Sequence, residues 1–161
     1  SSADKITKIE IAEGVTSIGA YAFFGCENVT EVIVPDTITA IGKEAFTNCY
    51  SLKSLYLPEG LESIGFHAFW ATAITELNFP STLMQTDRPC AGMEQLTNVV
   101  YADNIIVIPS YILYDCQSVT NVTLPEGVTS IGNSAFADCT SLTDVYISSK
   151  RTGSTEKQCN R

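Results

Sequence analysis

A nine-residue phrase recurs along the chain, and its spacing limits the folds that this sequence can adopt. The phrase reads Ile-Gly-x-x-Ala-Phe-x-x-Cys, and it is complete at residues 18–26, 41–49 and 131–139. Its first position recurs every 22 or 23 residues, at Ile18, Ile41, Ile64, Thr86, Ile108 and Ile131. A fixed period of this size is typical of a solenoid, in which each coil buries its apolar face only against its neighbours.

A second pattern follows the cysteine position and predicts one strand in each coil. It reads apolar-x-x-apolar-x-apolar, usually closed by proline, as at residues 29–35 and 52–58. Alternation with a period of two indicates a strand with one buried face, and proline ends it because proline cannot donate to a ladder. We expect equivalent strands of successive coils to pair in parallel, about 4.8 Å apart, with right-handed connections.

Together these residues resemble the BspA-like, or Treponema-type, leucine-rich repeat family, whose consensus is similar to Leu-Pro-x-x-Leu-x-x-Ile-Gly-x-x-Ala-Phe-x-x-Cys-x-x-Leu-x-x-Ile-x-Ile. The resemblance implies a leucine-rich-repeat solenoid, a right-handed superhelix with a parallel β-sheet on the concave face and short 3₁₀ or helical turns on the convex side. We predict one domain at residues 5–148, made of a half-coil and six coils of 22–23 residues. The polar tail at 149–161 is expected to be disordered; docking of this basic tail on the acidic body is the alternative.

Coils four and five depart from the repeat. In coil four, Thr86 and Ala91 stand where large apolar groups are expected, and Cys90 falls at the small Ala position. In coil five, Leu113 takes the Phe position. We predict a looser core or a local bend in this region, because the column of large apolar side chains is interrupted.

The repeat region is strongly acidic. All but two of the 18 acidic residues lie between Ile9 and Ile147, where the basic residues are Lys43, Lys53 and Arg88. This balance argues against nucleic acid and anionic membrane surfaces as partners. No apolar run approaches the ~20 residues of a membrane-spanning helix, so we expect no membrane insertion of this segment.

Neither end of the sequence resembles a capping module, although a solenoid needs a polar cap over its last apolar coil. We therefore expect a monomeric fragment of a longer protein, and end-to-end self-association is the alternative. No signal peptide is visible at Ser1. Either a leader was removed or the chain never carried one.

Six cysteines raise the question of disulfides or a metal site. Four of them, Cys26, Cys49, Cys116 and Cys139, share one repeat position and are expected to form an inward column. We favour free, buried thiols. Disulfides between neighbouring strands stay open on distance, although side chains in a parallel ladder point the same way. No Cys-x-x-Cys spacing supports zinc, and Cys159 in the tail is the thiol expected to be exposed.

The sequence predicts no catalytic residue and no cofactor. His67, the only histidine, lies at a variable repeat position that faces outward in other coils, so we expect a solvated surface residue. A nucleophile and histidine pair would need a third group to hold the base, and no phosphate-binding glycine pattern occurs.

Acidic residues follow the strand end in five coils, at Glu13, Asp36, Glu59, Asp103 and Glu126. Stacked carboxylates could bind calcium, a cation that prefers oxygen ligands. Acidic residues before Gly or Asn also suit solvated turns. We favour the turn interpretation and expect no metal site.

Two outward columns on the concave sheet face form the predicted ligand-binding site. The candidate residues are Glu31, Ile33, Tyr56, Glu76, Asn78, Asn98, Val100, Asn121, Thr123, Asp144 and Tyr146. Aromatic anchors within a polar surround are typical of recognition surfaces. Tyrosine and β-branched residues also favour strands for structural reasons, so both interpretations stay open for Tyr56 and Tyr146.

The family resemblance implies a cell-surface or secreted protein of a host-associated microbe, with attachment to host extracellular proteins as a typical role. We therefore predict a non-enzymatic protein-binding or adhesion module that uses the concave sheet face. Its expected partner is a protein, such as a host extracellular-matrix or serum protein. The alternative is a structural spacer or stalk segment with no ligand of its own, since a fold does not determine a function.

Overall fold

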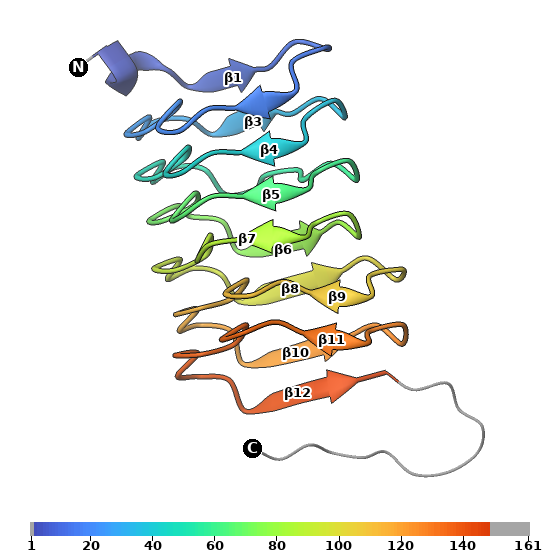
Figure 1. Ribbon diagram of the computed structural model, residues 1–161. Coiled ribbons are helices and arrows are strands. Elements are labelled where there is room, and N and C mark those ends of the chain that lie inside the picture. Colours follow the sequence, from blue (N-terminus) through green and yellow to red (C-terminus); the bar gives the residue numbers. More distant parts are fainter. Residues whose placement is uncertain (1, 149–161) are drawn as a thin grey trace.

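The computed structural model describes residues 2–148, which form a stack of coils with parallel strands on two sides (Figure 1). A 3₁₀ helix, η1 (Ser2–Lys5), precedes the first coil. One side, called the front face below, carries β1 (Lys8–Glu10), β3 (Glu31–Ile33), β6 (Glu76–Phe79), β8 (Asn98–Tyr101), β10 (Asn121–Leu124) and β12 (Asp144–Ile147). The return side carries β2 (Ser17–Ile18), β4 (Ala40–Ile41), β5 (Ser63–Ile64), β7 (Gln85–Thr86), β9 (Val107–Ile108) and β11 (Ser130–Ile131). The predicted solenoid of parallel strands is confirmed.

The strand register reproduces the sequence period. On the front face, β1 pairs with β3, β6 with β8 and β10 with β12, all in parallel. On the return side, β2, β4, β5 and β7 form one four-stranded sheet, and β9 pairs with β11. Ile18 lies opposite Ile41, and Ile41 lies opposite Ile64. Residues one period apart in the sequence are therefore neighbours in space.

Two details differ from the prediction. Residues 52–57 of coil two form no regular strand, although Leu52, Leu55 and Leu57 are buried as the alternation requires. The return side is built from turns and two-residue strands, and no helix occurs within residues 6–148. Each turn contains residues with positive φ, such as Glu44 (51°) and Asn48 (63°). This left-handed conformation does not continue a right-handed helix.

The core is a set of columns that run through the coils. Phe23, Phe46 and Phe69 stack with ring centroids 5.4 and 6.3 Å apart. Phe46 and Phe69 are fully buried, whereas Phe23 and Phe136 in the outer coils are half-buried. The central coils are therefore covered by neighbours on both sides, as expected for a solenoid.

Coil four is aligned differently from the sequence prediction. The first positive-φ residue follows the leading isoleucine position by three residues at His67 and Tyr111, but it follows Thr86 by two residues, at Arg88. One residue is thus missing from this turn. As a result, the assignments of Cys90 and Ala91 were wrong by one position.

The thiol contacts of the following coil support this alignment. The Cys139 Sγ lies 2.9 Å from the carbonyl oxygen of Leu113, which holds the Phe position, and the Cys116 Sγ lies 3.5 Å from that of Cys90. Cys90 therefore occupies the Phe column, and Met93 occupies the cysteine column. Both side chains are buried.

The backbone ladders are interrupted around coils four and five, where the sequence predicted a looser core or a local bend. Within residues 2–148, no strand pairing joins β7 to β9 or β8 to β10. The core there stays closed, because Cys90, Met93 and Leu113 have 0%, 1% and 0% of their surface exposed. The break falls where the shortened turn of coil four meets the full-length turn of coil five.

Glycine after the leading isoleucine lets successive coils approach closely. A Cβ on Gly42 would lie 2.5 Å from the amide nitrogen of Ala20, and one on Gly65 would lie 2.5 Å from that of Lys43. Such distances are far inside van der Waals contact. A Cβ on Gly19, in the first coil, would meet no atom within 4 Å.

Replacing Gly65 with alanine is expected to lower the free energy of unfolding by about 1–3 kcal/mol, because the added methyl group must displace backbone of the preceding coil. Urea unfolding followed by circular dichroism measures this change. The matched control is Gly19→Ala, which should alter stability by less than about 0.5 kcal/mol. Equal losses in the two variants would contradict the role of the glycine column.

Candidate functional site

The structure places the predicted ligand-binding residues on the front face as two adjacent columns. The exposed ones are Glu31, Ile33, Tyr56, Glu76, Asn78, Asn98, Val100, Asn121, Thr123 and Tyr146. Asp144 differs from the prediction because it is half-buried. Paired strands bring residues of one column together, as where Asn78 lies opposite Val100 and Thr123 opposite Tyr146.

The first column, from Lys8 to Asp144, satisfies part of its polar surface internally. The Lys8 Nζ lies 3.6 Å from the Glu31 Oε1, and the Asn98 side-chain amide donates a hydrogen bond to the Glu76 carboxylate. The Thr143 hydroxyl donates to the Asp144 Oδ2 at 2.8 Å. Groups that already have partners gain less from a ligand than unpartnered ones, because binding must exchange one hydrogen bond for another.

The second column, from Glu10 to Tyr146, presents apolar and aromatic surface to solvent. The exposed fractions are 40% for Ile33, 54% for Tyr56, 45% for Val100 and 46% for Tyr146. The Tyr56 hydroxyl donates to the Asp36 Oδ1 at 3.0 Å, and this hydrogen bond raises the pKa of Tyr56. The bond also restrains the exposed ring, which reduces the entropy that binding would remove.

The cysteine column is buried in the core and forms no disulfide among the described residues. Cys26, Cys49 and Cys116 are buried and Cys139 is half-buried, all as free thiols. The Cys49 Sγ donates to the carbonyl oxygen of Phe23 in the preceding coil at 3.3 Å. Burial raises the pKa of Cys49 to about 12 and that of Cys139 to about 11. These thiols connect adjacent coils through hydrogen bonds, and their raised pKa makes them poor nucleophiles near neutral pH. Cys159, which the sequence predicted to be exposed, lies outside the described residues.

A second surface, on the return side, was not predicted from the sequence. We call it the aromatic edge, and it consists of Tyr21, Phe24, Phe66, His67, Trp70, Tyr111 and Tyr114. The Lys43 Nζ lies 5.5 Å from the ring centroid of Tyr21 and 5.7 Å from that of Phe66. The Arg88 Cζ lies 4.6 Å from the centroid of Tyr111. Aromatic residues at the variable repeat positions of coils one, three and five were the available sequence signal.

His67 belongs to this edge. The sequence predicted a solvated surface residue, but the side chain is only partly exposed. Its ring stacks on Phe66 with centroids 3.7 Å apart and is nearly parallel to Trp70 at 6.4 Å. The side chain is half-buried, and this burial lowers the pKa of His67. The histidine is therefore mainly neutral at pH 7 and acts as a flat packing surface.

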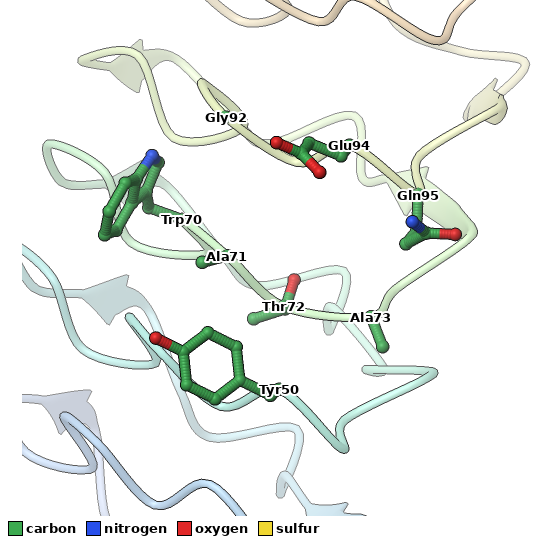
Figure 2. Close-up of a pocket in the computed structure, with 8 residues that line it drawn as sticks. All are labelled: Tyr50, Trp70, Ala71, Thr72, Ala73, Gly92, Glu94 and Gln95. Atoms are coloured by element: carbon green, nitrogen blue, oxygen red, sulfur yellow. The ribbon is translucent and has the colours of Figure 1, made fainter.

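A hollow of about 390 Å³ opens beside the aromatic edge (Figure 2). It is lined by Tyr50, Trp70, Ala71, Thr72, Ala73, Gly92, Glu94 and Gln95, from coils two, three and four. The hollow lies where coil three is one residue short, because only Ala73 separates Thr72, in the cysteine column, from buried Ile74. We call this hollow the notch.

The described residues show neither a metal-binding cluster nor a membrane-spanning segment. Within residues 2–148, no three His, Cys, Asp or Glu side chains are arranged so that they could hold a metal ion. No helix in this part of the chain has the length and hydropathy to cross a bilayer.

The sequence matches the family model described as the BspA type leucine rich repeat region, in six copies over residues 1–91 and 87–159. No curated protein matches this sequence. Among solved structures, a leucine-rich repeat protein from Bacteroides ovatus is 30% identical, with a TM-score of 0.74, and the match covers 89% of this chain and 40% of that one.

Two further solved structures are similar in fold. A leucine rich cell surface protein from Faecalibacterium prausnitzii is 24% identical, with a TM-score of 0.71 and coverage of 90% of this chain and 40% of that one. The pneumococcal vaccine antigen PcpA is 20% identical, with a TM-score of 0.70 and coverage of 88% and 40%. The chain thus spans about two fifths of the length of these relatives.

Stability is expected to fall as the pH rises above 9, in part through Cys49. Below the ordinary thiol pKa of 9.0, Cys49 is a neutral thiol in both the folded and the unfolded chain. The stability that its burial contributes is therefore fully present there. Between 9.0 and about 12 only the unfolded chain loses this proton, so stability falls by up to about 1.4 kcal/mol per pH unit. Urea unfolding at pH 7, 9 and 10.5 should show a shallower decline for Cys49→Ala, and identical slopes would refute the assignment.

Proposed function

Because the chain belongs to the BspA-type leucine-rich repeat family, we propose that it is a non-enzymatic protein-binding module that uses its front face. The observation that supports this proposal is the second column, in which Ile33, Tyr56, Val100 and Tyr146 are all at least 40% exposed. Solenoids of stacked repeats typically use extended surfaces of this kind for binding.

The second column has the composition of a protein recognition surface. Its tyrosines and aliphatic side chains lie beside the polar first column, so apolar anchors have a polar border. Tyrosine is enriched among the residues that dominate binding energy, and such anchors act best when a surrounding rim excludes water. The strand spacing of about 4.8 Å would present one anchor position per coil to an extended partner.

The charge of the chain limits the kind of partner surface that it favours. The net charge is −9, and the exposed first column contributes Glu31 and Glu76. A partner with a neutral or basic contact surface would associate faster than an acidic one. Host extracellular-matrix and serum proteins are the proposed partners, and a cell-surface or secreted location agrees with the similarity to a leucine rich cell surface protein.

A structural spacer is the alternative function. The internal pairing of the first column favours it, since Glu31 and Glu76 are bonded to Lys8 and Asn98 of neighbouring coils. In a spacer, these pairs would serve only to hold the stack together. The two functions differ in whether the isolated chain retains a partner.

The double variant Tyr56→Ser/Tyr146→Ser is expected to weaken binding to matrix or serum proteins by at least about tenfold, because two anchors of the front face are lost. Pulldown with the immobilised chain, followed by surface plasmon resonance on the retained protein, measures this effect. Stability should fall by less than about 1.5 kcal/mol, since both residues are exposed.

The control is Tyr21→Ser, which removes an equally exposed tyrosine from the return side. It should leave partner binding unchanged. If the double variant binds as well as the unmodified chain, the front face is not the contact surface. If the unmodified chain retains nothing, the spacer function is favoured.

A further inference from the structure

Two basic side chains of the chain lie over aromatic rings of the aromatic edge. Lys43 lies over Tyr21 and Phe66, and Arg88 lies over Tyr111. A cation over an aromatic face is attracted by the negative potential of the ring. The chain thus uses its own basic side chains to cover aromatic rings at two places along the edge.

The notch also presents aromatic rings, but no basic side chain of the described residues covers them. Trp70 and Tyr50, which line it, are 41% and 53% exposed. Among residues 2–148, no lysine or arginine lies over either ring, and no salt bridge is formed by the Glu94 carboxylate. Glu94 belongs to coil four and lines the notch together with Trp70 of coil three (Figure 2).

The indole of Trp70 is held in position by its neighbours. A Cβ on Gly92 would lie 2.1 Å from the Trp70 Nε1 and 2.2 Å from its Cδ1, so the indole edge rests directly against the glycine backbone. The His67 ring lies nearly parallel to the indole, with centroids 6.4 Å apart and 18° between the planes. A ring that is already restrained loses little entropy when a ligand stacks on it.

From these observations we propose that the notch binds an arginine side chain of a partner protein. A guanidinium is planar, so it can stack on Trp70 or Tyr50 while its N–H groups donate to the Glu94 carboxylate. The Gln95 side-chain oxygen offers a further acceptor in the lining. A lysine ammonium can pair with Glu94 but cannot stack as a plane, so it should bind more weakly. The net charge of −9 also favours a cationic ligand.

Trp70 is the only tryptophan of the chain, so its fluorescence reports on the surroundings of this one ring. The full chain is titrated with N-acetyl-arginine amide, with the lysine analogue, and with N-acetyl-citrulline amide, which has nearly the same shape without the charge. We expect a saturable change with the arginine probe, at a Kd on the order of millimolar for a ligand of this size. The lysine probe should bind several-fold more weakly, and the citrulline probe about tenfold more weakly. Free N-acetyl-tryptophan amide corrects for collisional quenching.

The variant Glu94→Gln should weaken arginine binding about tenfold, because it removes the charge and keeps the size of the side chain. The matched control is Glu27→Gln, an exposed residue at the same repeat position in coil one, which should bind the probe as the unmodified chain does. Thermal unfolding of both variants verifies that they are folded. Equal affinity for the arginine and citrulline probes, or no effect of Glu94→Gln, would overturn the proposal.

The notch can be tested separately from the front face. The variant Tyr56→Ser/Tyr146→Ser should retain full arginine binding, because neither residue lines the notch. Loss of arginine binding in that variant, with the fold intact, would also contradict the proposal. Absence of any front-face partner would leave this measurement unaffected.

Discussion

The close approach of successive coils is the constraint on which the rest of the structure depends. At Gly42 and Gly65 the backbone of the preceding coil lies where any larger residue would place its Cβ. Parallel pairing on both sides then keeps the coils at strand spacing. Because the parallel register places residues one period apart opposite one another, these residues form columns.

Single missing residues change this regular stack locally. Coil three lacks a residue between Thr72 and Ile74, and the notch lies there. Coil four lacks one in its turn, and the return-side ladder is interrupted between β7 and β9. The core tolerates both changes because the columns are refilled by side chains of suitable size, as with Cys90 in the Phe column and Met93 in the cysteine column. In repeat proteins, changes in the length of single repeats fall in the loops, and these loops often form the binding surface.

Much of the fold and of the front face could be predicted because both depend on periodicity. The period gave the strand register, and the alternation correctly placed Tyr56 and Val100 outside and Leu55 and Val99 inside. The aromatic edge could not be predicted in the same way. Its contacts join variable positions of different coils, such as Lys43 with Phe66, and the repeat consensus contains no information on which variable side chains fold over one another.

The sequence by itself determined the solenoid, the order of its columns and the acidic character of its surface, since these follow from apolar spacing and from composition. Only the tertiary structure decided where the missing residue of coil four lies, and that Trp70 rests against Gly92 beside Glu94. The physical reason is that a deletion within a turn leaves the apolar pattern on either side unchanged. Its position is determined by which backbone groups and side chains of adjacent coils meet.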